Sequence, residues 1–294
     1  MSHPGLLQAW WLAARPKTLA AGIVPVLVGT AIAEMHGGFH FNAALACIVG
    51  SVLIQIATNL ANDYFDHKKG ADNEQRIGPA RAVQQGWISP RAMATATGFT
   101  LVLAFLVGLY LISIGGWPIA AIGISSLICA VAYTGGPLPL AYVGLGDLFV
   151  FIFFGIVAVT GTCFVQILSV PPEAWIAGTV IGLLATAILV VNNLRDRETD
   201  ALANKRTLAV RFGARVARFE YVFCVAGAFV VVGVAVMLGI APLSWLLSFL
   251  ALPLAIREII AIHRKDGPAL NEHLAGAAKV ELVFGFLMCI GAVL

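Results

Sequence analysis

The chain has 294 residues, of which 60% are hydrophobic and only 11% are charged, with a formal net charge of +3. Soluble domains typically have about 45–50% apolar and about 25% charged residues, so this composition excludes an ordinary water-soluble protein and indicates one embedded in lipid. The charges are also unevenly placed, because no Asp, Glu, Lys or Arg occurs over residues 92–146 or 221–256. A transmembrane helix needs about 20 predominantly apolar residues, so each of these uncharged runs is predicted to hold two spans.

Apolar segments and the Gly/Pro-rich breaks between them predict an all-α integral membrane protein with nine transmembrane helices. In chain order the predicted spans are Thr18–Ala33, Ala43–Asn62, Ala94–Ser113, Pro118–Tyr133, Leu148–Leu168, Ala174–Asn193, Phe219–Leu238, Pro242–Ile260 and Ala275–Leu294. We expect one membrane-embedded domain over residues 1–294. Its two longest polar connections, at about 64–91 and 194–218, are the places with enough polar residues for chemistry at a membrane surface.

The placement of basic residues supports this count and predicts an orientation. In a nine-span topology all 18 Lys and Arg residues fall on one side of the membrane. Lys/Arg-rich loops stay in the cytoplasm, so we expect a multi-pass protein of the inner or plasma membrane. Its N-terminus and both long connections would be cytoplasmic and its C-terminus outside. An error of one span would scatter the basic residues across both faces.

The first long connection opens with an acidic run, Asn62-Asp63-Tyr64-Phe65-Asp66-His67-Lys68-Lys69-Gly70-Ala71-Asp72. Nothing before Gly70 breaks a helix, so the second span is predicted to continue through Asp66. Residues spaced i, i+4, i+7 and i+11 lie on one helix face. The polar residues with this spacing, predicted to point into the bundle, are Gln55, Asn59, Asn62 (or Asp63) and Asp66.

The second long connection begins Asn192-Asn193-Leu194-Arg195-Asp196-Arg197-Glu198-Thr199-Asp200. Asp196 and Asp200 are spaced i, i+4, and like charges at this spacing on a helix repel, so we expect a cation between them. Mg²⁺ prefers oxygen ligands and typically uses one or two carboxylates plus substrate phosphates. Basic side chains can hold the remaining phosphate oxygens; those nearby are Lys68, Arg76, Arg81, Lys205 and Arg206. Two acidic motifs on one side of the membrane therefore predict a Mg²⁺–diphosphate site.

These motifs resemble the UbiA superfamily of intramembrane aromatic prenyltransferases. Its members have nine helices, an Asn-Asp-x-x-Asp motif after the second and an Asp-x-x-x-Asp motif after the sixth. Within the superfamily the resemblance is greatest to the prenyltransferases that act on 1,4-dihydroxy-2-naphthoate, and it covers nearly the whole chain. The matching segments are Arg15–Leu19, Asn59–Asp72, Arg76–Arg81, Tyr133–Pro137, Tyr142–Asp147 and Asn192–Gly213. The resemblance implies a UbiA-like bundle.

The resemblance also implies roles for individual residues. The residues that would hold Mg²⁺ against the diphosphate are Asp63, Asp66, Asp196 and Asp200, with Asn59 and Asn62 beside them as further catalytic residues. Arg81 and Lys205 match the family's basic positions and would bind the leaving diphosphate. The other candidate substrate-binding residues are Lys68, Arg76, Asp72, Tyr133 and Asp147. Many family members have a further Asp where this chain has Gly70, and Asp72 is the candidate substitute.

The implied activity is Mg²⁺-dependent transfer of a polyprenyl chain from prenyl diphosphate to 1,4-dihydroxy-2-naphthoate with loss of CO₂. The product would be demethylmenaquinol, for menaquinone biosynthesis. The expected partners are prenyl diphosphate, an aromatic acid acceptor and the lipid bilayer, and no nucleic acid. The residues alone leave open the prenyl chain length and the acceptor, for which 4-hydroxybenzoate, homogentisate and porphyrin-type acceptors are the alternatives. A transporter is the alternative from another class, because buried acids in membranes often mark ion pathways; here, however, the acids are at helix ends.

Overall fold

The computed structural model describes residues 4–72 and 77–294, and these residues form helices and connections without any strand. The predicted all-α class is confirmed. The elements in chain order are α1 (Leu6–Ala14), α2 (Pro16–Met35), α3 (Phe41–Lys68), α4 (Pro90–Ala132), α5 (Gly146–Val150), the π-helical η1 (Phe151–Val157), α6 (Ala158–Ile167), α7 (Pro172–Arg195), α8 (Arg197–Leu202), α9 (Leu208–Met237), the 3₁₀-helical η2 (Leu243–Ala251), α10 (Leu252–Arg264), the 3₁₀-helical η3 (Gly267–Leu270) and α11 (Asn271–Val293).

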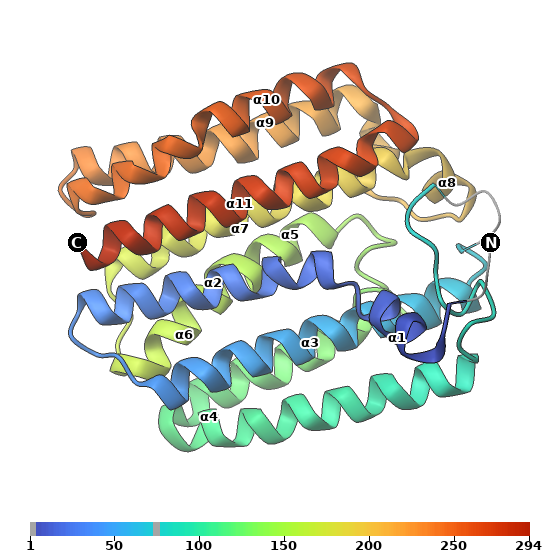
Figure 1. The fold of residues 1–294 in the computed structure, drawn as a ribbon, viewed down its shortest axis with the longest axis horizontal. Coiled ribbons are helices and arrows are strands. Elements are labelled where there is room, and N and C mark those ends of the chain that lie inside the picture. Colours follow the sequence, from blue (N-terminus) through green and yellow to red (C-terminus); the bar gives the residue numbers. More distant parts are fainter. Residues whose placement is uncertain (1–3, 73–76) are drawn as a thin grey trace.

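Within the described residues, eight helical segments are long and apolar enough to cross a membrane, and one of them contains two spans. This segment is α4, whose 43 residues would measure about 65 Å as one straight helix, against a hydrocarbon core of about 30 Å. Its backbone breaks at Gly116, where φ is 65° and ψ is −149°, and Pro118 follows. In Figure 1 the chain turns back at the left-hand end of α4. Counting α4 as two spans gives the nine that the sequence predicts.

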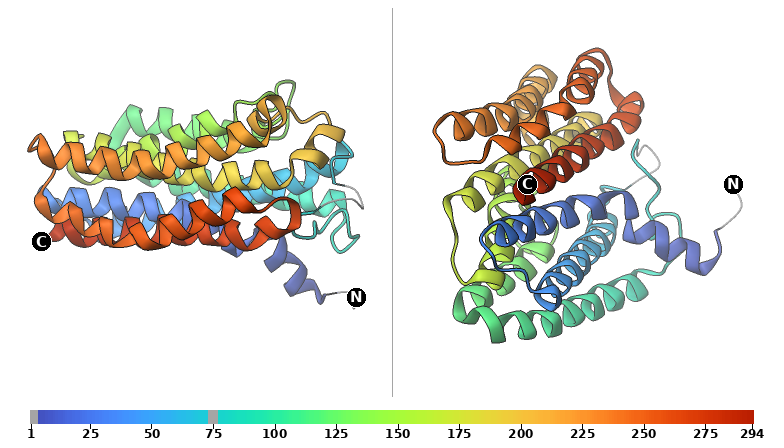
Figure 2. Two further views of the ribbon diagram at one scale, coloured as in Figure 1. Left: turned by 90° about the horizontal axis from the view of Figure 1, so that it is seen from above. Right: turned by 60° about the vertical axis from the view of Figure 1, so that its left-hand side comes forward.

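The helices differ strongly in how much of their surface other helices cover. In an 18-residue apolar stretch of α7, 67% of the residues are buried inside the protein, whereas in the corresponding stretch of α4 only 17% are. Figure 1 shows α9 and α10 along one side of the bundle and α4 along the opposite side, with α2, α3, α7 and α11 between them. The right-hand view of Figure 2 shows the same separation. The helix α7 is therefore central and α4 is peripheral.

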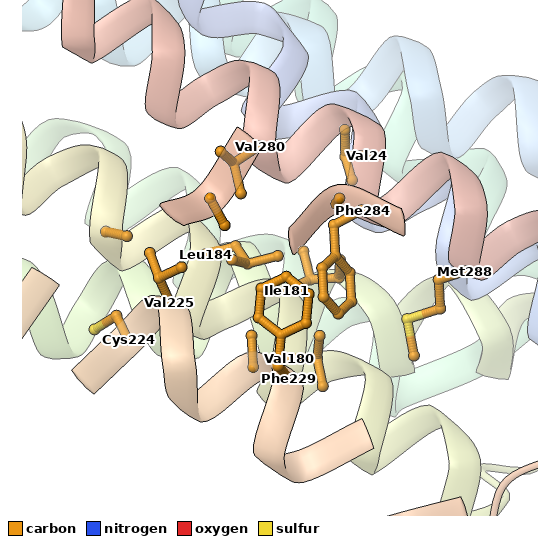
Figure 3. Close-up of a cluster of buried hydrophobic side chains, with 14 of the residues drawn as sticks. Val24, Val180, Ile181, Leu184, Cys224, Val225, Phe229, Val280, Phe284 and Met288 are labelled. Atoms are coloured by element: carbon orange, nitrogen blue, oxygen red, sulfur yellow. The ribbon is translucent and has the colours of Figure 1, made fainter. Parts of the chain in front are cut away.

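The largest cluster of buried apolar side chains joins α2, α7, α9 and α11. Figure 3 shows Val24, Ile181, Phe229 and Phe284 gathered there. The Phe229 ring is edge-on to Phe284, with 5.0 Å between ring centroids, and such aromatic pairs stabilise beyond the area they bury. A Cβ added at Gly155 of η1 would lie 2.3 Å from the Cα of Gly182, so η1 and α7 are in direct backbone contact. This half of the bundle is densely packed.

The helix ends that carry the acidic motifs meet at one end of the bundle, on the right in Figure 1. The helix α3 is continuous through Asp66, as predicted, and ends at Lys68. The predicted connection 194–218 is shorter than expected, because α8 and the start of α9 occupy most of it. The Thr207 side chain accepts the Val210 N–H and caps α9, as Thr does at many helix starts. The helix breaks at Gly213, where φ is 82° and ψ is 172°, so the part of α9 after this break starts earlier than the predicted span, which began at Phe219.

Candidate active site

A cavity of about 620 Å³ lies between the helices and includes the end where both motifs meet. Its polar lining residues include Arg15, Gln55, Asn59, Asn62, Asp66, Asp72, Arg81, Tyr133, Asn192, Asn193, Asp196, Asp200, Lys205 and Asn271. The rest of its wall is mostly apolar and reaches Cys47 on α3, which precedes Asp66 by about 28 Å along the helix axis. The cavity therefore has a charged end and a long apolar part.

Asp66 lies in the last turn of α3 and is bound by two side chains. Its Oδ1 accepts the Tyr142 hydroxyl at 2.8 Å, and its Oδ2 accepts Arg81 Nη2 at 3.0 Å. Asp72 Oδ2 lies 3.2 Å from Arg81 Nε, so one buried guanidinium joins two carboxylates. Gly70 has a φ of 71°, a conformation that favours glycine, and it turns the chain after α3. This turn brings Asp72 back toward Arg81.

Asp63 is placed differently from Asp66. It is only 2% exposed and does not line the cavity. Its Oδ2 accepts the Ala82 N–H at 2.9 Å and its Oδ1 accepts the Val83 N–H at 3.2 Å. The structure therefore does not bring Asp63 together with the other acids that were expected to hold the metal.

Asn59 and Asn62 of α3 line the cavity, and both form hydrogen bonds to neighbouring segments of the chain. Asn59 Nδ2 donates to Ala14 O and to Thr18 Oγ1, both at 3.0 Å. These contacts lie at the junction of α1 and α2, where Arg15 has a φ of 53°, and a left-handed residue with a Cβ costs about 1–2 kcal/mol. Asn59 therefore fixes a strained junction whose Arg15 side chain lines the cavity. Further up α3, Asn62 Oδ1 accepts the Thr134 hydroxyl at 2.8 Å.

The second motif spans the junction of α7 and α8, where Asp196 leaves helical geometry with a φ of −91° and a ψ of 6°. The Asp200 N–H donates to Asp196 O at 2.7 Å, so the two carboxylates are one turn apart, as the spacing predicts. Arg195 binds Asp196 through two bonds, Nε to Oδ1 at 2.8 Å and Nη2 to Oδ2 at 2.6 Å. It also donates to Asn192 Oδ1 and, at 3.1 Å, to Asn271 Oδ1. Arg195 thereby joins the second motif to the start of α11.

Asp200 has one oxygen paired and one available. Its Oδ1 lies 3.3 Å from Lys205 Nζ, and its Oδ2 is buried with no hydrogen-bond partner among the residues that the structure describes. Burial raises the pKa of Asp200 to about 6; Lys205 opposes this rise and the charge of Asp196 adds to it. A buried carboxylate with an available oxygen is suited to a cation.

Comparison with known proteins decides the family. The UbiA prenyltransferase family model matches residues 22–283. The chain belongs to the UbiA prenyltransferase family. It is therefore a prenyltransferase and a multi-pass membrane protein.

Full-length relatives and solved structures agree with this membership. The chain is 36% identical to the 1,4-dihydroxy-2-naphthoate octaprenyltransferase of Haemophilus influenzae, over 97% of this chain and 96% of the relative. It is 37% identical to the Escherichia coli enzyme of the same name, over 97% and 94%. A UbiA homologue from Aeropyrum pernix K1 shares the fold, with a TM-score of 0.72 at 15% identity over 92% of this chain and 97% of that one. So does a homologue from Archaeoglobus fulgidus bound to DMAPP and Mg²⁺, with a TM-score of 0.66 at 15% identity over 95% and 98%.

Not all basic residues expected to bind substrate in this UbiA family member reach the cavity. Lys68 is exposed and does not line it. The next residue, Lys69, donates to Thr134 O and lies 4.2 Å from the centre of the Tyr142 ring. One residue turns the direction of a side chain by about 100° around a helix, which separates the two lysines. Arg76 lies outside the described residues.

Tyr133 and Asp147 take different positions in this UbiA bundle. Tyr133 lines the cavity, and burial, followed by the charges of Asp147, Asp200 and Asp66, raises its pKa, so it remains a neutral phenol. Asp147 is buried without lining the cavity. Its Oδ1 accepts Asn193 Nδ2 at 3.4 Å, and Asn193 does line the cavity. Asp147 thus contacts a residue of the cavity wall, and its expected contact with the substrate stays a prediction.

Several cavity residues were not among the sequence-based candidates. The lining residues of this kind are Arg15, Asn192, Asn193 and Asn271. Two further residues, Tyr142 and Arg195, do not line the cavity but bind Asp66 and Asp196. The Asn pair precedes the second motif in the sequence and could have been chosen on that ground. Tyr142 lies in the matching segment Tyr142–Asp147, which was a signal, whereas Asn271 has none, because tertiary packing alone brings it to the second motif.

The residues present fit the divalent cation expected for the family. Within residues 4–72 and 77–294, no three or more His, Cys, Asp or Glu side chains gather closely enough to hold a metal by themselves. Mg²⁺ commonly uses only one or two carboxylates and completes its shell with water and substrate phosphates. The carboxylates of Asp66, Asp196 and Asp200 line one cavity, so the donor set is suited to an ion that arrives with a diphosphate.

Proposed function

We propose that this UbiA family member transfers a polyprenyl chain from prenyl diphosphate to 1,4-dihydroxy-2-naphthoate, with loss of CO₂. The product is demethylmenaquinol, a precursor in menaquinone biosynthesis. Five relatives named as octaprenyltransferases of this acceptor, 33–40% identical over 84–97% of the chain, support the acceptor. One observation carries the reaction type. The wall of a single cavity combines carboxylates from both motifs, basic side chains and a long apolar extension.

The charged end of the cavity is the proposed diphosphate site. Asp66, Asp196 and Asp200 would hold Mg²⁺, which supplies positive charge to the leaving diphosphate. Arg81 and Lys205 bind the diphosphate oxygens. Arg81 Nη1 supports this role, because it is buried with no hydrogen-bond partner among the described residues. A buried unpaired donor is costly, and a diphosphate oxygen satisfies it.

The apolar part of the cavity receives the prenyl chain and keeps the reacting carbon dry. The reaction breaks the carbon–oxygen bond to diphosphate, and the carboxyl-bearing ring carbon attacks the allylic carbon. The bond from that ring carbon to the carboxylate then breaks, its electron pair returns to the ring and CO₂ leaves. The rings of Tyr133, Phe149 and Phe153 line the cavity, where they exclude water and face developing positive charge favourably.

Product analysis tests the proposal. Membranes that contain the protein are incubated with an allylic diphosphate, Mg²⁺ and either 1,4-dihydroxy-2-naphthoate or 4-hydroxybenzoate, and product masses are measured. We expect a prenylated naphthoquinol without the carboxyl mass, which is lost when EDTA is added. Prenylated hydroxybenzoate as the only product would overturn the acceptor, and no metal-dependent product with either acceptor would overturn the proposed reaction.

The orientation is part of the proposal. With the basic residues in the cytoplasm, the motifs face the cytoplasmic side of the inner or plasma membrane, where the charged diphosphate is available. The motif-bearing ends of α3 and α7 lie at the same end of the bundle, which supports a single cytoplasmic face. The C-terminus then lies outside.

The Gly123→Phe variant is expected to shorten the prenyl chain that the enzyme accepts. Gly123 lines the apolar part of the cavity, and a Cβ there meets nothing within 4 Å, so the ring would occupy space for the chain without a clash. We expect kcat/KM for a long-chain donor to fall about tenfold or more relative to geranyl diphosphate. The control is Gly98→Phe, which is on α4 with equally open space but away from the cavity. An equal loss with both donors would contradict the prediction.

Acid is expected to weaken metal binding through Asp200. Its raised pKa of about 6 means that the carboxyl takes up a proton between pH 7 and pH 5, well above the range of an ordinary aspartate. The proton competes with the metal, so half-saturation at pH 5 requires about tenfold more metal than at pH 7. Binding of Mn²⁺ to the purified protein, followed by electron paramagnetic resonance at each pH, measures this. Asp200→Asn should lose the dependence; an affinity of the wild-type protein that is equal at both values would refute it.

A further inference from the structure

The two acids of the first motif bind different partners. Asp66 binds side chains in the cavity wall, whereas Asp63, three residues earlier on α3, binds backbone N–H groups outside it. Both Asp63 oxygens are engaged, one by Ala82 and the other by Val83. A carboxylate that accepts backbone N–H groups forms charge-assisted hydrogen bonds, which are roughly twice as strong as neutral ones.

The two amides begin a compact turn that follows Arg81. Within this turn Gln85 N–H donates to Arg81 O and Gly86 N–H donates to Val83 O, both at 3.0 Å. The first amides of such a turn have no partner inside it, and Asp63 supplies one from a neighbouring helix. Buried Ala82 and Val83 also pack in an apolar cluster with Leu60, one turn before Asp63 on α3. The turn is therefore attached to α3 by polar and by apolar contacts.

This attachment fixes the side chain of Arg81. Arg81 directly precedes Ala82, is 5% exposed, and reaches both Asp66 Oδ2 and Asp72 Oδ2. Its guanidinium can hold this geometry only if its backbone is fixed relative to α3. Asp63 performs that function through the next two residues, while its own carboxylate stays out of the cavity.

We propose that Asp63 is a positioning residue that fixes Arg81 at the diphosphate site and is not a ligand of the metal. Asp63 does not line the cavity, so its carboxylate could reach a metal there only by turning away from the Ala82 and Val83 N–H groups and leaving them without this partner. In the first motif Asp66 then faces the metal, whereas Asp63 fixes the position of Arg81, whose guanidinium binds the leaving diphosphate. The inference rests on the proposed function for the role of Arg81.

Two measurements on the full chain in detergent distinguish a positioning role from a ligand role. The first compares Asp63→Asn with Asp66→Asn for Mn²⁺ binding without substrates and for the KM of prenyl diphosphate. Asparagine keeps the size of Asp63 but retains only one acceptor oxygen. We expect Asp63→Asn to bind Mn²⁺ within about twofold of wild type and to raise KM about tenfold. Its effect on KM should largely disappear in an Arg81→Lys background. A loss of Mn²⁺ affinity like that of Asp66→Asn, or effects that multiply with Arg81→Lys, would overturn the inference.

The second measurement uses the unmodified protein and so does not depend on a variant that folds. Hydrogen–deuterium exchange at Ala82 and Val83 is followed with and without Mg²⁺ and prenyl diphosphate. A positioning role keeps both amides protected in the loaded state, whereas a ligand role releases them, so faster exchange on loading would overturn the inference. Metal binding and exchange need no acceptor. A failure of the proposed prenyl transfer would therefore appear as absent product and would remove only the KM comparison, whereas Mn²⁺ binding and exchange would still decide the role of Asp63.

Discussion

Asp66→Ala is expected to lower kcat at least a thousandfold while the protein remains folded. The substitution removes a carboxylate that lines the cavity and that binds both Tyr142 and Arg81. A preorganised charged or polar group at a transition state contributes about 10²–10³ in rate, and loss of the partner that orients Arg81 adds to this. Arg81 keeps its contact with Asp72, so the fold loses only part of its ion-pair network. Initial rates of product formation at saturating substrates measure the effect.

Glu198→Gln is the matched control for this experiment. Glu198 lies between the two aspartates of the second motif, but its side chain is 81% exposed and, within the described part of the chain, pairs only with the partly exposed Arg197. We expect its kcat to stay within about twofold of wild type, because exposed ion pairs contribute little. More than a tenth of wild-type activity in Asp66→Ala would contradict the proposed site, as would an equal loss in Glu198→Gln. Thermal unfolding in detergent verifies that both variants are folded.

Arg81→Met is expected to damage both stability and activity. The substitution leaves the buried carboxylates of Asp66 and Asp72 without their shared cation. Removing one partner of a buried ion pair typically costs about 3–5 kcal/mol. The loss of a diphosphate-binding guanidinium should reduce kcat/KM more than about a thousandfold, because substrate binding and stabilisation of the leaving group are both affected. Arg81→Lys should show a smaller loss, since the charge remains but the forked geometry does not.

Arg197→Met provides the comparison for Arg81→Met. Arg197 belongs to the second motif and has the same charge, but among the residues that the structure describes it forms an ion pair with exposed Glu198 alone, at 3.4 Å. Its free energy of unfolding should change by no more than about 0.5 kcal/mol, with kcat/KM near wild type. Denaturation in detergent and steady-state kinetics measure both quantities. If Arg81→Met were as stable and as active as Arg197→Met, the ion pairs of Arg81 with Asp66 and Asp72 would contribute neither to stability nor to catalysis.

The sequence predicted the parts of the fold that depend on hydropathy and on helix breakers. Nine spans followed from uncharged segments and Gly/Pro breaks, and the break at Gly116 is the case where that signal was needed to divide α4. The continuation of α3 through Asp66 followed from the absence of a breaker before Gly70. The one-turn spacing of Asp196 and Asp200 followed from helical geometry and is present as the bond between Asp200 N–H and Asp196 O.

The sequence could not predict which of several neighbouring polar residues at a helix end faces the cavity. Lys68 and Lys69 are adjacent and identical in type, and only the structure shows that Lys69 contacts Tyr142. Asp63 and Asp66 are both acidic, and the separate partner of Asp63 is a turn about 20 residues later in the chain, which no local pattern reveals. The same holds for Arg195, because its partner Asn271 is brought to it by the packing of α11 against α7.

Because α4 lies at the edge of the bundle, we expect the surrounding lipid to influence the shape of the cavity that α4 helps to line. Most of α4 is not covered by protein, yet both of its halves contribute Gly108 and Gly123 to the wall of the cavity. Mismatch between a helix and the local bilayer thickness is relieved by tilting or bending of the helix, and a tilt of α4 changes the width of the space available to the isoprenoid. Central α7 is insulated from such changes by its neighbours. We therefore expect lipid composition to affect the tail-binding half of the cavity more than the acidic motif at the end of α7.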